Sequence, residues 1–550
     1  MSQVVRYECR DSNHEVYIVQ PGERISVYGS CSVLCLAGCV SLNDYILPCV
    51  SCEPSNFIKM SAPQRMDVPV VLQVYNEGST YKHARLKFRL KEVIPKCYES
   101  IMEEIGSSQP GVLVFNKLLD RAEGTIAGAV PNFLIHSSIQ KEIILPPHYH
   151  ISLDDFQIYP HSEENKLRKQ LDRLKQLRND GQKTSILPIG HKGAGKSNLM
   201  RNLVNRCFSN GYDSVYVLDC DIGQSEFTPN GCLSLTKVTA PILDKPYGHQ
   251  KTTFDNCYFY GDITVRNKDL YMDIFERLFN KFKIISKPGA ICIVNSMGWV
   301  VDIGAEILDG ITRVIEPDLF VEIYRDQAEP RYNFKDVNQD HVVEIFANNS
   351  SGVVGVQAQK RLPAPLIRDL TIAGYFSSQL PRPSLASFAS VVPFKLKFNN
   401  LTIAVPVDLL VEDNHIFSSI NTQLMALCIK MPELESRKLC GRQDMPFISV
   451  YDEKSPALQC IGFGIIRGIS LEKRCLYVVT PVNLLKLDEP PVLVRGMRIQ
   501  TPSMFFTADP YNRCPYVLNL PEQKTTAELH MNGLYQPSVN TTQFKRSRKV

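Results

Sequence analysis

The sequence has no long hydrophobic run. None of its apolar stretches approaches the roughly 18 uninterrupted residues that a membrane-spanning helix requires. The first ten residues, MSQVVRYECR, reach charged and polar side chains before the apolar centre of a secretory signal could form. These absences exclude membrane-embedded classes and predict a soluble intracellular protein with no membrane partner.

Charge of one sign is also scarce, because the net charge is only +4 over 550 residues. A balance this small does not indicate a nucleic-acid-binding protein, so such a function must rest on a local patch. One candidate is a predicted helix over 163–179, where leucines recur at helical spacing and Gly181 suits its end. Its other face carries six basic residues: Lys166, Arg168, Lys169, Arg173, Lys175 and Arg178. This face is either a solvated surface or a contact for an RNA backbone.

Cysteine, in contrast, is abundant, with 17 residues. In a reducing compartment most of them are expected to be small buried thiols. Five cluster near the start of the chain: Cys31, Cys35, Cys39, Cys49 and Cys52. Cys49 and Cys52 have the spacing of half a zinc knuckle, but no second close pair accompanies them. The cluster therefore favours buried thiols, with a zinc site as the alternative.

The pattern of apolar residues divides the chain into three parts. Residues 1–160 contain short β-branched and apolar runs between turn residues, which predicts a β-rich N-terminal domain. In residues 161–385, buried-strand runs alternate with helical stretches, which predicts an α/β domain with a mostly parallel sheet. Residues 386–550 are β-rich again and end in a basic tail, Lys545–Lys549. That tail is either a nuclear address or a frayed terminus.

The central part contains a complete phosphate-binding motif. Eight residues fit G-x-x-x-x-G-K-S without exception: Gly190, His191, Lys192, Gly193, Ala194, Gly195, Lys196 and Ser197. They lie between a predicted strand over 184–190 and a predicted helix from about Lys196, which is the context that such a loop requires. Lys196 would reach the β- and γ-phosphates, and the Ser197 hydroxyl would ligate Mg²⁺. Pro188 is unexpected inside this strand, because it cannot donate a ladder hydrogen bond.

The guanine-binding motif Asn-Lys-x-Asp is absent downstream of the loop. Asn267, Lys268 and Asp269 resemble it but have the wrong spacing. This absence disfavours a GTP switch and leaves ATP as the expected nucleotide.

Two acids follow the next predicted strand, which covers 215–218. Asp219 and Asp221 are two residues apart and so point the same way on an extended segment. An acid at the end of a neighbouring strand is what Mg²⁺ coordination beside a phosphate-binding loop requires. One acid could serve the metal while the other orients or deprotonates the attacking group. The alternative is a strand-end turn with solvated aspartates.

A third segment, Asn295–Trp299, follows a predicted strand over 290–294. Trp299 is the only tryptophan of the chain. At the carboxyl end of a strand in an open parallel sheet, it would lie on the side where ligands bind. It could stack on a nucleic-acid base there, or it could be an ordinary core aromatic residue.

Together the segments GHKGAGKS, DCDIGQSEFTP and NSMGWV resemble the polynucleotide 5′-hydroxyl kinases of the nucleolar protein 9, Grc and Clp type. The run Asp221–Pro229 with Gly231–Leu235, and the later Gly374–Ser377, look most like the nucleolar protein 9 branch. The specific motifs cover about residues 190–380, and the β-rich flanks also match the family. Ser197 and Ser296 stand where many relatives carry threonine, and either hydroxyl can serve.

The resemblance implies ATP-dependent phosphorylation of the 5′-hydroxyl of RNA, with ATP and Mg²⁺ as cofactors. It implies that Asp221 accepts the hydroxyl proton and binds metal, that Asp219 is a supporting acid, and that Gln224 helps to position water, metal or acceptor. Trp299 becomes the candidate platform for the terminal RNA base. The family also uses lid arginines over the triphosphate, for which Arg361 and Arg368 are the candidates.

The resemblance further implies a place in pre-rRNA processing, in the nucleus and nucleolus, with an endonuclease partner whose cleavage leaves a 5′-hydroxyl. Two other functions stay open at this point. The chain could be an ATP-bound scaffold subunit without kinase activity, as some relatives are. It could also be a P-loop ATPase that couples ATP turnover to conformational work.

Overall fold

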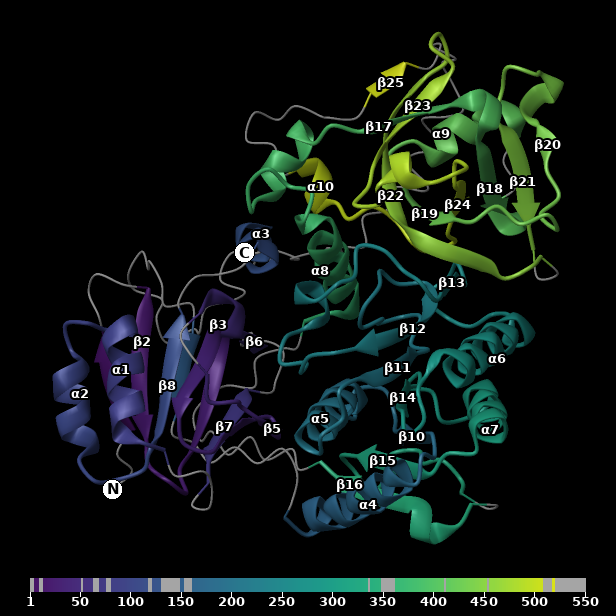
Figure 1. Ribbon diagram of the computed structural model, residues 1–550. Helices are drawn as coiled ribbons and strands as arrows, with labels where there is room; N and C mark the ends of the chain where they lie inside the picture. The colour runs from purple at the N-terminus through teal and green to yellow at the C-terminus, as the bar shows by residue number, and fades with distance from the viewer. Residues whose placement is uncertain are drawn as a thin grey trace, which may run out of the picture.

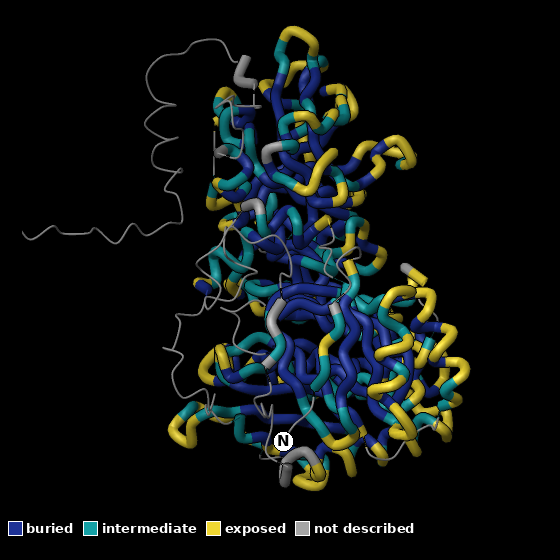
Figure 2. The backbone as a smooth tube through the Cα atoms, turned by 90° about the vertical axis from the view of Figure 1, so that its left-hand side faces the viewer, coloured by how far each residue is buried: buried dark blue, intermediate teal, exposed yellow. Residues whose placement is uncertain are grey.

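The computed structural model describes residues 4–8, 13–50, 53–62, 69–75, 81–116, 121–129, 149–152, 161–334, 337–347, 362–409, 412–452, 455–507 and 517–519 of the chain. Three regions follow one another in Figure 1: an N-terminal sheet with helices on one face, a central α/β region, and a C-terminal β-rich region. In Figure 2 the buried residues form the interior of each region, and the exposed residues gather on outer loops. Within the described ranges, no helix is both long and apolar enough to cross a membrane.

The N-terminal region is a nine-stranded sheet with strand order β1-β2-β8-β3-β7-β4-β5, in which β6 and β9 also pair with β3. Its strands are β1 (Val4–Glu8), β2 (His14–Val19), β3 (Arg24–Ala37), β4 (Val40–Leu42), β5 (Tyr45–Ile46), β6 (Ile58–Ala62), β7 (Val70–Val74), β8 (Gly111–Asn116) and β9 (Tyr149–Ser152). The sequence predicted separate short strands around Val27 and Val33, whereas both lie in the single long strand β3. Gly29 within it has φ of 90°, so a glycine absorbs the distortion without ending the strand.

Two helices cover this sheet, α1 (His83–Val93) and α2 (Tyr98–Ile105), whereas α3 (Arg121–Ala129) packs against α8 (Ala364–Ser377) (Figure 1). The strand-based interpretation of the sequence did not include them. Leu86, Leu90 and Val93 of α1 recur at helical spacing and are buried against β2 and β8. The rest of α1 is highly charged, so the composition of the segment does not reveal this narrow apolar stripe.

The central region is an α/β domain, as the sequence predicted. Its strands follow the order β16-β15-β10-β14-β11-β12-β13, and the first five are parallel. They are β10 (Thr184–Ile189), β11 (Val215–Asp219), β12 (Cys232–Val238), β13 (Cys257–Phe259), β14 (Ile291–Asn295), β15 (Leu319–Tyr324) and β16 (Val342–Phe346). The helices are α4 (His161–Asn179), α5 (Lys196–Ser209), α6 (Lys268–Ile285), α7 (Ile303–Ile315) and α8 (Ala364–Ser377). α4 and α5 cover one face of the parallel strands, and α6 and α7 cover the other (Figure 1).

Pro188 is accommodated because the ladder between β10 and β14 ends before it. The paired residues run only from Thr184 opposite Ile291 to Ile186 opposite Ile293. The carbonyl of Pro188 then accepts a hydrogen bond of 2.9 Å from the Ser296 hydroxyl. The Ser296 side chain therefore forms a hydrogen bond with β10 beyond the point where the backbone pairing between β10 and β14 ends.

The C-terminal region is β-rich, as expected. Its elements are β17 (Phe394–Lys397), β18 (Thr402–Pro406), α9 (Ile416–Ile420), β19 (Leu424–Cys428), β20 (Arg437–Lys438), β21 (Phe447–Tyr451), β22 (Leu458–Ser470), β23 (Cys475–Val479), β24 (Val492–Arg495), α10 (Met504–Thr507) and β25 (Val517–Asn519). The central sheet continues into it, because β13 pairs with β22 through Tyr258 opposite Gln459 and Phe259 opposite Leu458. This junction places the C-terminal region beside the carboxyl ends of the central strands.

Candidate active site

The phosphate-binding loop leaves β10 and enters α5. Gly193 and Gly195 have φ of 84° and 114°, a backbone region that side-chain-bearing residues rarely adopt. Gly190 is equally constrained, because a Cβ there would lie 2.3 Å from the carbonyl oxygen of Ile323. The loop therefore needs glycine at these positions, and it ends at the positive N-terminus of α5. Such a loop is a binding site for an anion such as phosphate.

Lys196 is buried, although its side chain carries a charge. Its Nζ donates a hydrogen bond of 2.9 Å to the carbonyl of Gly190, and only 7% of the residue is exposed. Burial lowers the pKa of Lys196 to about 8, while the carboxylate of Asp221 opposes that shift. The ammonium is thus held in a poorly solvated place where an additional negative charge would stabilise it.

Asp221 lies beyond the end of β11. Its Oδ1 accepts hydrogen bonds from the backbone N–H groups of Gly223 at 3.1 Å and Gln224 at 3.0 Å. Burial raises the pKa of Asp221, and the Lys196 ammonium is the largest opposing influence. Because Oδ1 is engaged by the loop, Oδ2 is the oxygen that remains for a substrate or metal.

Asp219 has a different environment from Asp221. It is buried, and its Oδ1 accepts a hydrogen bond of 2.8 Å from Nδ2 of Asn295. Its Oδ2 accepts one of 2.6 Å from the backbone N–H of Glu226. Burial raises the pKa of Asp219 to about 7 despite these bonds. Both carboxylate oxygens of Asp219 therefore accept hydrogen bonds from the protein. The residue connects β11 to β14 and to the loop that follows β11.

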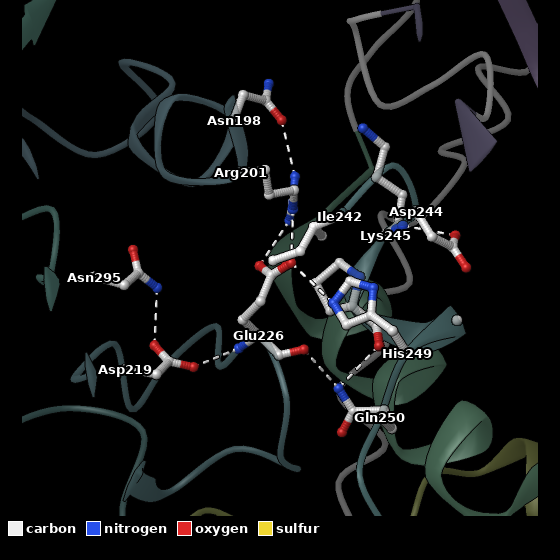
Figure 3. Close-up of polar contacts among 12 residues, drawn as sticks. Asn198, Arg201, Asp219, Glu226, Ile242, Asp244, Lys245, His249, Gln250 and Asn295 are labelled. Atoms are coloured by element: carbon white, nitrogen blue, oxygen red, sulfur yellow. Dashed lines mark hydrogen bonds and ion pairs between the residues drawn. The ribbon is translucent and has the colours of Figure 1, made fainter. Parts of the chain in front are cut away.

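Glu226, which we did not single out from the sequence, is the centre of a buried polar cluster (Figure 3). Arg201 of α5 contacts both of its carboxylate oxygens, at 2.7 and 2.8 Å, and Nε2 of His249 lies 2.9 Å from one of them. Burial alone would raise the pKa of Glu226, but Arg201 and His249 lower it to about 2. Its partners are distant in sequence, so no spacing rule could have found this cluster. It fixes the loop after Asp221 to the helix that follows the phosphate-binding loop.

The segment Asn295–Trp299 lies against the phosphate-binding loop. A Cβ at Gly298 would approach Cα of Lys192 to 2.7 Å and Nζ of Lys196 to 2.9 Å. Trp299 follows directly and is 36% exposed, so it is not a core aromatic residue. The exposed Val301 and Ile303 continue the apolar surface beside it. The indole of Trp299 lies beside Gly304 of α7, where a Cβ would be 2.5 Å from its Cγ.

The two lid candidates differ in what the structure describes. Arg361 lies outside the described residues. Arg368 is half-buried in α8, and burial lowers its pKa; Asp369 is the largest opposing influence, and Asp221 also opposes the shift. Arg368 is therefore within electrostatic range of Asp221.

A small cleft, with room for little more than a water molecule, opens beside the first turn of α5. It lies between the N-terminal and central regions, with Asn43 and Ser61 on one side and Asn198 and Asn202 on the other. Nδ2 of the buried Asn202 has no hydrogen-bond partner among the described residues. The cleft is thus a polar space next to the phosphate-binding loop.

The structure describes the basic helix and part of the cysteine cluster. Lys166, Arg168, Lys169 and Lys175 of α4 are exposed, so contact with an RNA backbone stays a prediction; Cys49 is also exposed. Leu167, Leu171 and Leu174 of α4 are buried, while Arg178 donates to the carbonyls of Asn210 and Gly211 and lies over the ring of Tyr212. Arg173 likewise donates to the carbonyl of Asp318. Cys31 and Cys35 are buried in β3, and Sγ of Cys35 lies 3.7 Å from Sγ of Cys49. Cys52 lies outside the described residues, as does the basic tail.

Comparison with known proteins agrees with this geometry. Residues 190–378 match the family model described as the mRNA cleavage and polyadenylation factor CLP1 P-loop. Residues 389–502 match the model of the NOL9-like C-terminal domain. A Caenorhabditis elegans protein named polynucleotide 5′-hydroxyl-kinase nol-9 is 71% identical over 549 residues, which cover 100% of both chains. The chain belongs to the polynucleotide 5′-hydroxyl kinase family.

Members of this kinase family in vertebrates are more distant. The human polynucleotide 5′-hydroxyl-kinase NOL9 is 29% identical over 341 residues, covering 54% of this chain and 46% of the human one. Among solved structures, the wild-type Clp1p-Pcf11p complex contains a chain with a TM-score of 0.52 at 12% identity, covering 91% of this chain and 98% of that one. That likeness shows a shared fold. The kinase family is a family of phosphotransferases, so the resemblance read from the three motifs is confirmed.

Proposed function

We propose that the chain transfers the γ-phosphate of ATP to the 5′-hydroxyl of RNA. The observation that carries this proposal is the close approach of the Asn295–Trp299 segment to the phosphate-binding loop. Gly298 is packed against Lys192 and Lys196, and the exposed Trp299 stands next to it. A phosphate donor and a nucleic-acid base would thereby be held side by side.

The residues present fit ATP and Mg²⁺. The glycine loop and the N-terminus of α5 form a cradle for phosphates, and no acidic side chain among the described residues forms an ion pair with the buried Lys196 ammonium. Ser197 and Asp221 supply the hydroxyl and carboxylate oxygens that a hard cation prefers. When bound, Mg²⁺ would neutralise charge on the transferring phosphates.

Asp221 would accept the proton of the attacking hydroxyl. Burial raises the pKa of the Asp221 carboxyl group toward neutral pH, and a carboxylate with a higher pKa accepts a proton more effectively. Its backbone hydrogen bonds fix Oδ1 and leave Oδ2 for the acceptor. Asp219 would support it indirectly, by holding the strand end and the loop, and Gln224 would contact the acceptor or its metal.

Arg361 and Arg368 both stay candidates for the lid arginine, and Arg368 is the one that the structure describes, in α8. Phosphoryl transfer passes through a loose transition state, so positioning and neutralisation of charge supply most of the catalysis. A guanidinium near Asp221 would add positive charge to the transferring group and help to exclude water.

We further propose a role in pre-rRNA processing in the nucleolus, with an endonuclease partner that generates the 5′-hydroxyl end. The names of the relatives and the match to the NOL9-like C-terminal domain support this proposal. The division into residues 1–160, 161–385 and 386–550 is proposed with it, with the flanking parts positioning RNA or partner.

The test is a transfer assay with γ-labelled ATP and two RNA oligonucleotides that differ only at the 5′ end. We expect label on the RNA with a 5′-hydroxyl and none on the RNA with a 5′-phosphate. ATP binding without transfer to either RNA would contradict the kinase and favour the scaffold. ATP turnover that ignores both RNAs would favour an ATPase. DNA oligonucleotides in parallel would show which sugar the acceptor site prefers.

A further inference from the structure

A segment of the C-terminal region lies directly against the loop that carries Asp221. Gly231, near the end of that loop, would place a Cβ 2.1 Å from Cδ1 of Ile499. Gly496 lies beside the turn that follows β13, because a Cβ there would be 3.1 Å from the carbonyl oxygen of Gly261. The two regions therefore meet at glycine positions, where no larger residue fits without a shift.

A chain of backbone hydrogen bonds connects this segment to Asp221. The N–H of Met497 donates to the carbonyl of Gly261 at 2.8 Å, and the N–H of Gly261 donates to the carbonyl of Gly231 at 3.1 Å. The N–H of Gly231 then donates to the carbonyl of Ile222 at 2.9 Å. Ile222 is the residue after Asp221, so the C-terminal region reaches the neighbour of the acid in three bonds.

Arg498 adds a charged contact at the same place. Its Nε donates to Oδ1 of Asp262 at 2.8 Å, and one of its terminal nitrogens donates to Oδ2 at 3.0 Å and contacts the Thr264 hydroxyl. Asp262 is buried, whereas the Arg498 side chain is 42% exposed. A bidentate pair of this kind fixes orientation more strictly than a single contact.

The loop held by Arg498 supports the residues beside Asp221. Oδ1 of Asp262 also accepts from the N–H of Ile263 at 2.6 Å, and this bond holds the start of the residue whose carbonyl faces Gly223. A Cβ at Gly223 would lie 3.0 Å from this carbonyl and 3.4 Å from Oδ1 of Asp221. The carbonyl of Ile263 therefore packs against the turn whose N–H groups bind the Asp221 carboxylate.

We propose that Arg498 is a positioning residue of the kinase site, which through Asp262 and the 261–264 loop fixes Asp221 relative to Lys196. The C-terminal region is then part of the apparatus that orients the catalytic acid. This inference rests on the proposed function, since it gives Arg498 the task of placing the base for the acceptor hydroxyl.

The experiment compares the full-length Arg498→Ala, Arg498→Lys and Arg442→Ala variants with the unchanged chain. Arg442 forms a pair with Asp444 on the surface of the same region, so it is a matched control for loss of an arginine. Each variant is assayed for kcat and KM with 5′-hydroxyl RNA, for ATP Kd and for Tm. We expect Arg498→Ala to lower kcat by about tenfold to hundredfold, because small displacements of a reacting group are costly.

ATP Kd should stay within about threefold of the unchanged chain, because the contacts of the phosphate-binding loop remain. Arg498→Lys should recover part of the rate, since its ammonium still pairs with Asp262, and Arg442→Ala should behave as the unchanged chain. Equal kcat for Arg498→Ala and Arg442→Ala would overturn the inference. A parallel loss of kcat, ATP binding and Tm in both Arg498 variants would also overturn it, because it would show a merely structural contact.

Failure of this inference is distinguishable from failure of the proposed function. If the unchanged chain transfers phosphate and Asp221→Asn does not, the function stands whatever Arg498 does. If the unchanged chain transfers no phosphate, or Asp221→Asn transfers it normally, the proposed function itself fails.

Discussion

Nδ2 of Asn295 donates a hydrogen bond of 2.8 Å to Oδ1 of Asp219, and this contact joins the third sequence motif to the second. Asn295 is the last residue of β14 and Asp219 the last of β11, and the two are opposite each other in the parallel ladder. Because both residues are buried, the bond is made without competition from water. The neighbouring residues of each motif, Asp221 and Gly298, are thereby kept on the same edge of the sheet.

The first prediction concerns this contact. Asn295→Ala and Asp219→Ala should each lower kcat, because an unpaired buried group costs about 1–3 kcal/mol and the strand ends become free to separate. The double variant should lose less than the sum of the single losses, with a coupling of about 1 kcal/mol, since each change removes the same bond. Measurement of kcat for the two single variants and the double variant gives this coupling. Asn338→Ala, on an exposed turn, is the control, and strictly additive losses would contradict the account.

The second prediction concerns the pH dependence of ATP binding. Burial lowers the pKa of Lys196 to about 8 in the free protein, and bound phosphates should raise it again. ATP affinity should therefore be constant below pH 8 and fall above it, approaching about tenfold per pH unit until the pKa of the complex is reached. Titrations from pH 7 to above pH 9 test this. Lys196→Ala should bind ATP more weakly, lose this pH dependence and lose transfer by a factor of about 1,000 or more. Near-normal transfer by that variant would refute the role given to Lys196.

The third prediction concerns Gly298. Gly298→Ala adds a Cβ that would meet the backbone of Lys192 and Nζ of Lys196 at under 3 Å, so the phosphate-binding loop must shift. We expect weaker ATP binding and a fall in kcat of about tenfold or more. Gly310→Ala in α7 is the control, because its Cβ meets only the flexible side chain of Met272. Equal ATP Kd in the two variants would show that Gly298 does not constrain the loop.

The fourth prediction concerns Trp299. Trp299→Ala should raise the KM for RNA by about fivefold to hundredfold, because stacking on one base contributes about 1–3 kcal/mol. KM for ATP should change little, and Trp299→Phe should retain most of the RNA affinity because it keeps an aromatic face. An unchanged KM for RNA in Trp299→Ala would count against stacking.

The fifth prediction concerns stability. Glu226→Gln leaves the Arg201 guanidinium without its buried partner, which should lower the free energy of unfolding by about 3–5 kcal/mol at pH 7. Arg201 and His249 lower the pKa of Glu226 to about 2 from an ordinary value of 4.5. The carboxylate therefore stabilises the fold above pH 4.5, and that contribution declines as the pH falls from 4.5 toward 2.

Urea unfolding of the unchanged chain and of Glu226→Gln, at pH 7 and near pH 3.5, measures the difference between their free energies of unfolding. The difference in free energy of unfolding between the unchanged chain and Glu226→Gln should be smaller at the lower pH. A gap that widens in acid would show that Glu226 is not ionised in the folded protein.

The sequence predicted the central region well because its signals are local. The phosphate-binding loop, the acids after β11 and Trp299 after β14 each follow a buried apolar run, and parallel strands bring their carboxyl ends to one edge. Trp299 is exposed, as a platform for a base must be, and its contact with RNA stays a prediction.

Other features depend on contacts between distant residues, and the sequence could not supply them. Asp219 and Asp221 look equivalent two residues apart, but only Asp219 has both oxygens engaged, because Asn295 and Glu226 approach it. The pairing of Arg498 with Asp262 joins residues 236 positions apart. Pro188 looked unsuitable for a central strand only because the sequence does not show where the ladder between β10 and β14 ends.

The most direct measurement is single-turnover transfer of γ-labelled phosphate to 5′-hydroxyl RNA, with ATP saturating, for the unchanged chain and for Asp221→Asn. The account predicts labelled RNA with the unchanged chain and loss of transfer with Asp221→Asn, while both proteins still bind ATP. Transfer at equal rates by the two proteins, or no transfer by the unchanged chain, would contradict it.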